Sequence, residues 1–178
     1  MGFDLDALTQ AARQHGPIAR VVVADVVGST PRDTGASMLV WKTGQSGTIG
    51  GGALEYQAAR AARKAIEQGK SSALFSRHPL GPDLGQCCGG SVALVTEFFS
   101  TQSMPKADGN LLIRRITGAP TLPLSAKRIL ADQRGQGVVP KPGLYDGWMF
   151  EPVFAPSAQL WIWGAGHVGR ALVHMFAT

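Results

Sequence analysis

The chain has 178 residues, enough for one domain with a hydrophobic core and no disulfide framework. Apolar residues make up 44% and charged residues 16%, which is typical of a globular protein with few solvated helices. The net charge of +5 comes from scattered basic residues and not from a dense basic stripe, which argues against nucleic-acid binding. The sequence shows no signal peptide, and its longest uncharged run is broken by proline and glycine. We therefore expect a cytoplasmic protein that binds neither nucleic acid nor membrane.

The first hundred residues predict alternating helices and strands. Apolar residues at helical spacing predict a helix over residues 4–15, which ends at Gly16-Pro17. Strands are expected over 18–28, 36–42, 72–80 and 87–99, with a tight turn over 43–47. The strongest helix signal covers residues 53–69. Its predicted buried face consists of Leu54, Ala58, Ala61, Ala62, Ala65 and Ile66.

The second part of the chain shows weaker patterns. Residues 100–109 are predicted to be a linker, followed by a strand over 111–118 and a helix over 124–135. The candidate apolar positions of that helix are Leu124, Ile129 and Leu130. One or two short strands are expected around Trp148, Phe150 and Val153, and a last strand, 160–163, precedes a helix. The mixture of helices and strands predicts a mixed α/β fold.

A Gly-x-Gly-x-x-Gly pattern follows the last predicted strand at Gly164, Gly166 and Gly169. In dinucleotide-binding folds such glycines allow the tight turn and the close approach of a pyrophosphate. The acidic ribose partner should lie about 20 residues further on, but the sequence ends at Thr178. We therefore interpret the pattern as a glycine turn that packs a helix, and we expect no NAD(P) binding. The apolar residues of this segment are expected to pack on the first domain or to self-associate.

A second glycine motif is Thr-Ile-Gly-Gly-Gly before the strongest helix. Gly50, Gly51 and Gly52 are predicted to present open amide groups to an anion at the positive end of the helix. The alternative is a flexible connection from strand to helix, and in either case Glu55 is placed to act as a capping carboxylate.

A polar loop over residues 28–35 follows the first strand. Arg32 in this loop is a candidate for bidentate binding of a phosphate or carboxylate, because ligands bind at the carboxyl ends of strands in open α/β sheets. The alternative is a surface ion pair between Arg32 and Asp33.

Two adjacent cysteines, Cys87 and Cys88, follow Gln86 and precede two glycines. Adjacent cysteines form a disulfide only with strain, and their spacing does not fit a zinc site. They are candidates for soft-metal or sulfur chemistry, and the alternative is a buried structural cysteine. The scattered histidines at positions 15, 78, 167 and 174 are interpreted as structural.

Taken together, GSTPRDTGASMLV, GTIGGGALE, LGQCCGG and LWIWGAGHVGRAL occur in an order that resembles the xanthine dehydrogenase accessory factor (XdhC/CoxI) family. The resemblance implies an XdhC/CoxI-like domain over 1–100, a connecting region with short strands and one helix over 101–157, and the truncated start of a Rossmann-like domain over 158–178.

The resemblance also implies a function. Such a factor is a chaperone without turnover of its own, which binds the molybdenum cofactor and supports its sulfuration and insertion into a xanthine dehydrogenase-type molybdenum hydroxylase. The implied partners are the apo-hydroxylase and a cysteine desulfurase, and the expected self-association of the apolar C-terminal segment adds a second copy of the chain. The expected cofactor contacts are Arg32, Gly50, Gly51, Gly52, Gln86, Cys87 and Cys88, with molybdenum near the two cysteines. The alternatives are a fragment of a nucleotide-dependent oxidoreductase and a docking module that binds no cofactor.

Overall fold

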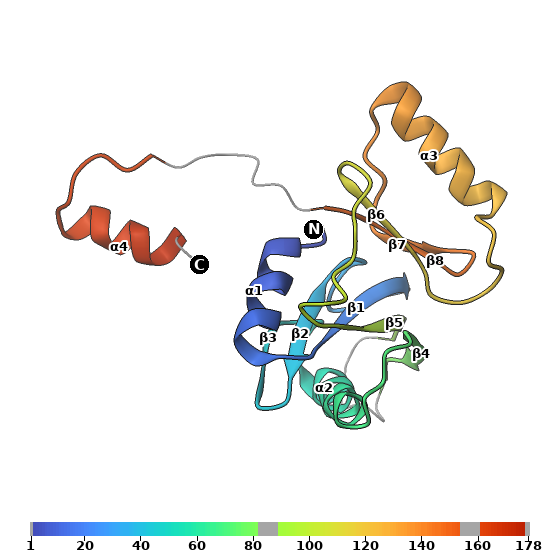
Figure 1. The fold of residues 1–178 in the computed structure, drawn as a ribbon, viewed down its shortest axis with the longest axis horizontal. Coiled ribbons are helices and arrows are strands. Elements are labelled where there is room, and N and C mark those ends of the chain that lie inside the picture. The colour runs from blue at the N-terminus through green and yellow to red at the C-terminus, as the bar shows by residue number, and fades with distance from the viewer. Residues whose placement is uncertain (1, 82–88, 154–160, 177–178) are drawn as a thin grey trace.

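The computed structural model describes residues 2–81, 89–153 and 161–176. Within these ranges the helices are α1 (Leu5–His15), α2 (Gly52–Glu67), α3 (Leu124–Gln136) and α4 (His167–Phe176). The strands are β1 (Ile18–Val27), β2 (Ser37–Trp41), β3 (Gly44–Gly47), β4 (Leu74–Pro79), β5 (Ser91–Phe99), β6 (Leu111–Arg115), β7 (Gly143–Tyr145) and β8 (Trp148–Pro152). The expected mixed α/β class is confirmed (Figure 1). None of the helices described here has the length and apolar character needed to cross a membrane.

The main sheet has the strand order β3-β2-β1-β5-β4, and all of its pairs are antiparallel. Its central strand, β1, is buried without interruption from Ile18 to Val23 because both of its faces are covered. On one face, Leu54 and Ala62 of α2 pack against Val21 of β1 and its neighbours. The small side chains of α2 let this helix lie close to the sheet.

The opposite face of β1 is covered by α1 and by a second, small sheet with the order β6-β8-β7. Val22 of β1 and Met149 of β8 are both fully buried in the cluster between the two sheets. Helix α3 lies on the outer side of the small sheet (Figure 1), where Ala126 packs with Phe150. The N-terminal segment joins the two sheets, because the amide of Phe3 donates to the carbonyl oxygen of Pro152 at 2.7 Å.

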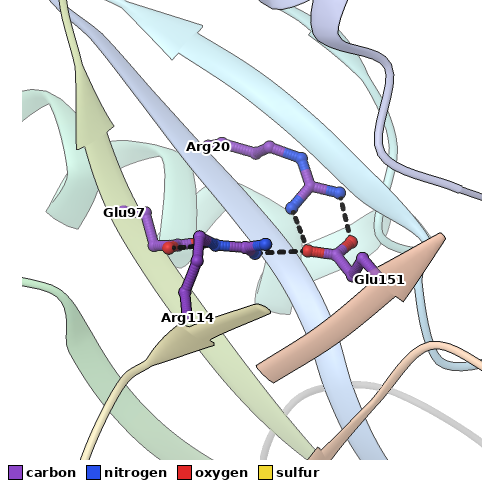
Figure 2. Close-up of polar contacts among 4 residues, drawn as sticks. All are labelled: Arg20, Glu97, Arg114 and Glu151. Atoms are coloured by element: carbon purple, nitrogen blue, oxygen red, sulfur yellow. Dashed lines mark hydrogen bonds and ion pairs between the residues drawn. The ribbon is translucent and has the colours of Figure 1, made fainter. Parts of the chain in front are cut away.

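Four charged side chains form a network between the two sheets (Figure 2). Arg20 of β1 donates to both carboxylate oxygens of Glu151 in β8, at 3.0 and 2.6 Å. Arg114 of β6 binds Glu97 of β5 at 2.6 and 2.8 Å and also donates to Glu151. Glu151 is fully buried, and Arg20 is only 2% exposed. The two arginines and two glutamates balance in charge, so the network links four strands without leaving a net buried charge.

Several details differ from the sequence expectations. The turn predicted over 43–47 is only Lys42-Thr43, and residues 44–47 form β3, because a two-residue loop suffices to close this hairpin. On α2, Ala61 is exposed and Ala59 is buried, so the predicted face is shifted by part of a turn. Leu124, predicted to be an apolar contact of its helix, is 72% exposed because it is the first residue of α3.

The expected strand over 160–163 is wrong for residues 161–163, which have no strand partner in the described structure. Helix α4 follows as expected, but none of its residues is buried. Trp161 and Trp163 are 73% and 76% exposed, and α4 lies apart from both sheets in Figure 1. The expectation that this segment packs on the first domain is therefore wrong, and its self-association stays a prediction.

The first prediction concerns the buried network. Glu151→Gln leaves Arg20 and Arg114 buried without their shared carboxylate and should lower the free energy of unfolding by about 3–5 kcal/mol. Asp25→Asn is the matched control, because Asp25 pairs with Arg77 at 3.4 Å on the surface and should cost less than about 1 kcal/mol. Urea unfolding of both variants measures the difference. Equal losses would show that the network contributes no more than a surface pair.

Acid should act through the same residue. Burial alone raises the pKa of Glu151, but the charges of Arg20 and Arg114 and their hydrogen bonds outweigh it and lower this pKa below its ordinary value of 4.5. A carboxyl whose pKa is lower in the folded state stabilises the fold above its unfolded pKa and loses that contribution as the pH falls. Wild-type stability should therefore fall below about pH 4.5 more steeply than that of Glu151→Gln, as measured by unfolding at a series of pH values.

Candidate functional site

Two of the sequence motifs, and Gly90 from a third, meet at one end of the main sheet. The strand register places the end of β1 beside the start of β5, through the pair Val27 and Ser91. It also places the start of β2 beside the end of β3, through the pair Met38 and Gly47. We call residues 28–36, which connect β1 to β2, the arginine loop, and residues 48–52, which lead from β3 into α2, the glycine loop.

Glycines allow these segments to touch. A Cβ atom at Gly90 would lie 2.4 Å from the carbonyl oxygens of both Val27 and Ser29, so only glycine fits where the chain enters β5. A Cβ atom at Gly50 would lie 2.8 Å from Cγ of Pro31, and 3.4 Å from Cγ of Arg32. The glycine loop and the arginine loop are therefore in direct contact, with Arg32 at their junction.

The glycine loop is held by a carboxylate of the same chain. Glu55, in the first turn of α2, accepts hydrogen bonds from the hydroxyl of Thr48 at 2.5 Å and from the amides of Ile49 and Gly51 at 3.0 Å each. The amide of Gly50 donates to the hydroxyl oxygen of Thr48 at 3.1 Å. The predicted role of Glu55 as a capping carboxylate is confirmed, and the expectation that the amides of Gly50 and Gly51 are open to a ligand is wrong. Gly51 is the N-cap residue of α2, and Gly52 is its first residue.

This arrangement fixes the charge of Glu55. Partial burial raises the pKa of Glu55, but the hydrogen bonds from the Thr48 hydroxyl and from the amides of Gly51, Ile49 and Gly50 outweigh burial and lower it. Glu55 is therefore an anion at neutral pH, and the positive end of α2 already holds a negative group.

Arg32 lies beside a cavity of about 340 Å³. The residues that line this cavity are Gly2, Asp4, Arg32, Gly35, Ser37, Gly47 and Thr48. The Nε atom of Arg32 is buried and has no hydrogen-bond partner among the described residues. The alternative for this residue, a surface ion pair with Asp33, is not among the ion pairs of the described residues. The side chain of Arg32 makes no ion pair or hydrogen bond among the described residues, and a guanidinium at a cavity can bind a phosphate or carboxylate.

The other predicted residues have different positions. Gln86, Cys87 and Cys88 lie outside the described residues. Gly164, Gly166 and Gly169 belong to the segment around α4, and this helix lies apart from both sheets (Figure 1). A Cβ atom at Gly169 would lie 2.4 Å from the carbonyl oxygen of Gly164, so this glycine permits the close turn before α4. Within the described parts of the chain, no group of three or more His, Cys, Asp or Glu side chains is arranged to hold a metal ion.

Sequence reasoning missed Asp4 and Ser37 as lining residues of the cavity, and it treated Thr48 only as part of the glycine motif. It also placed Arg32 by a rule for parallel sheets. The sheet is antiparallel, and the end beside the cavity combines the end of β1 with the start of β2. An aspartate directly before a helical pattern is a helix-cap signal, but only the tertiary structure brings that cap to Arg32.

Comparison with known proteins supports the resemblance stated from the motifs. Residues 11–76 match the model of the XdhC and CoxI family. This segment contains the arginine loop and the glycine loop and ends before the two cysteines. The recognition of this family is confirmed by the match. No curated protein matches the sequence significantly.

A solved structure shares the fold. It is a crystal structure described as a xanthine dehydrogenase from Bacillus halodurans, with a TM-score of 0.50 and 18% sequence identity. The similarity covers 93% of this chain and 46% of that one, so the chain spans less than half the length of this relative.

The contact between the two loops yields a prediction on stability. Gly50→Ala should destabilise the fold more than Gly51→Ala, by about 1 kcal/mol or more. Both residues have positive φ, 126° and 75°, so both substitutions strain the backbone. Only the Cβ atom at position 50 meets Pro31, because that at position 51 has no atom within 4 Å. Urea unfolding of the two variants measures the difference, and equal losses would mean that the loops separate easily.

Proposed function

We propose that this chain, whose residues 11–76 match the model of the XdhC and CoxI family, takes part in the maturation of a molybdenum hydroxylase. In this role it is an accessory factor that holds the molybdenum cofactor and supports its sulfuration and its insertion into a xanthine dehydrogenase-type enzyme. The observation that carries the proposal is the cavity lined by Arg32, which is half-buried and forms no ion pair among the described residues.

The chemistry of the cofactor suits this end of the sheet. Molybdopterin carries a phosphate, a pterin ring and two dithiolene sulfurs that bind molybdenum. Arg32 supplies a guanidinium for the phosphate. Gly50, Gly51 and Gly52 contribute through the shape of the backbone, because Gly50 allows Arg32 to pack against the glycine loop.

The two cysteines would supply soft thiolate ligands for molybdenum, or a thiol that carries the transferred sulfur. Cys88 stands two positions before Gly90 in the sequence, and Gly90 packs against Ser29 at the start of the arginine loop. This proximity in the chain supports a role for Gln86, Cys87 and Cys88 at the same end of the sheet.

The proposed partners are the apo-hydroxylase, which receives the cofactor, and a cysteine desulfurase, which supplies the sulfur. The chain itself carries out no turnover, works in the cytoplasm and associates with a second copy. The exposed Trp161 and Trp163 favour association with a second copy, because neighbouring large apolar side chains on a surface often mark a protein interaction site.

Cofactor retention tests the proposal directly. Purified protein is incubated with the molybdenum cofactor and passed through a desalting column, and the retained pterin is oxidised and measured by fluorescence. Arg32→Ala should retain at least about tenfold less pterin at equal protein concentration, since a hydrogen bond to a charged group contributes about 1.5–3 kcal/mol. Arg60→Ala, on the exposed face of α2, is the control and should behave as the wild type.

Absence of pterin retention by the wild-type chain would contradict the cofactor role and favour a docking module. Saturable binding of NAD(P)H in its place would favour an oxidoreductase fragment.

The cysteines are tested separately. The double variant Cys87→Ser, Cys88→Ser should fold normally, because the substitutions are nearly isosteric, and should fail to activate an apo-hydroxylase. Thermal unfolding and enzyme activation are the two measurements. Normal activation would remove the cysteines from the mechanism, and a large loss of stability would show that they are buried structural residues.

A further inference from the structure

The cavity beside Arg32 contains opposite charges that do not pair. Asp4 and Arg32 both line it, and no ion pair joins them among the described residues. Asp4 is exposed and Arg32 is half-buried, so solvent screens their attraction and both charges remain available to a ligand. A cavity of this kind suits a ligand that is anionic at one end and donates hydrogen bonds at the other.

Asp4 is held in place by two features of the fold. It is the N-cap residue of α1, where its Oδ1 atom accepts a hydrogen bond from the amide of Ala7 at 2.8 Å. The preceding residue, Phe3, is fully buried, and its amide is bonded to Pro152. The side chain of Asp4 is therefore held at the cavity and can still accept further hydrogen bonds. Each carboxylate oxygen has two acceptor positions, and the Oδ2 atom has no described partner.

We propose that Asp4 determines the specificity of this cavity by binding the 2-amino-4-oxopyrimidine edge of a ligand whose phosphate is bound by Arg32. That edge presents two neighbouring N–H donors, the ring N–H and the exocyclic amino group, and a carboxylate accepts both at once. The inference rests on the proposed function, in which the ligand is a pterin phosphate. The same edge and a phosphate also occur in guanine nucleotides, so the shared chemistry is the 2-amino-4-oxopyrimidine edge together with a phosphate.

The size and charge of the cavity agree with this assignment. Its volume of about 340 Å³ lies at the lower end of the range for small-molecule sites, about 300–1,000 Å³. Ser37 also lines the cavity and offers its hydroxyl group to a polar ligand, whereas the hydroxyl of Thr48 is bonded to Glu55 and Gly50. The negative charge of Asp4 also repels a phosphate, so the ligand binds in one orientation, with its phosphate at Arg32.

The test uses the full chain and four small probes. These are 6-hydroxymethylpterin phosphate, its unphosphorylated form, the corresponding lumazine phosphate, in which an oxo group replaces the 2-amino group, and GMP. Binding is followed by fluorescence for the pteridines and by competition for GMP. The variant is Asp4→Ser, because serine keeps the helix cap and removes the carboxylate. Asp6→Ser, an exposed acidic residue in the first turn of the same helix, is the control.

The wild type and Asp6→Ser should bind the pterin phosphate at least about tenfold more tightly than the lumazine phosphate. Asp4→Ser should lose this preference while it keeps the difference between phosphorylated and unphosphorylated pterin, which depends on Arg32. Thermal unfolding should show Asp4→Ser to be as stable as the wild type.

The other outcomes separate the two proposals. Unchanged discrimination in Asp4→Ser would overturn the role of Asp4 and leave the proposed cofactor function standing. Binding of GMP in preference to pterin phosphate, with discrimination lost in Asp4→Ser, would overturn the cofactor function and confirm the role of Asp4. Failure of the wild type to bind any of the probes would overturn both.

Discussion

The buried network of Arg20, Glu97, Arg114 and Glu151 is the interaction on which the relative position of the two sheets depends. Glu151 receives both arginines, so a single carboxylate in β8 is bonded to β1 of the main sheet and to β6 of the small sheet. The guanidinium of Arg20 also lies 4.3 Å from the ring centre of Phe3, and that of Arg114 lies 5.0 Å from it. The network thus holds Phe3, and Phe3 is followed directly by Asp4 at the rim of the candidate site. The fixed position of Phe3 in the core therefore also limits where Asp4, the next residue, can lie at the cavity.

Close backbone contact is the second constraint on the site. The arginine loop touches the entry to β5 at Gly90 and the glycine loop at Gly50, and in both places an added methyl group would overlap existing atoms. At these two contacts only glycine fits, so positions 50 and 90 contribute no side chain to the junction of the loops. Arg32, which lies at this junction, lines the cavity. The glycines of this site therefore act by bringing segments together, which is a use of glycine that does not require a bound anion.

Local patterns in the sequence predicted the helices and β1, because helical spacing and a continuous β-branched run are properties of short segments. They did not predict the antiparallel topology, since alternating helices and strands leave the direction of strand pairing open. The segment 160–163 shows the limit of such patterns: it is apolar enough for a strand, but residues 161–163 have no partner strand in the described structure. The ionic network was beyond sequence reasoning, because Arg20 and Glu151 are separated by 131 residues. For the candidate site, the residue types alone pointed to Arg32 and the glycines. Asp4 lines the cavity only because α1 packs beside it, which local patterns do not predict.

Glu55 decides which groups remain available for an anionic ligand. The glycine loop has the amides and the helix end that usually bind a phosphate, but the carboxylate of Glu55 already accepts the amides of Ile49 and Gly51 and the hydroxyl of Thr48. An incoming phosphate would have to displace an anion that is covalently part of the chain and whose pKa is lowered by these same bonds. The side chain of Arg32 has no hydrogen-bond or ion-pair partner among the described residues, so a ligand that binds it breaks no internal bond of that side chain. Under the proposed function, the balance of these two costs favours binding of the phosphate at the arginine loop, with the glycine loop as a support.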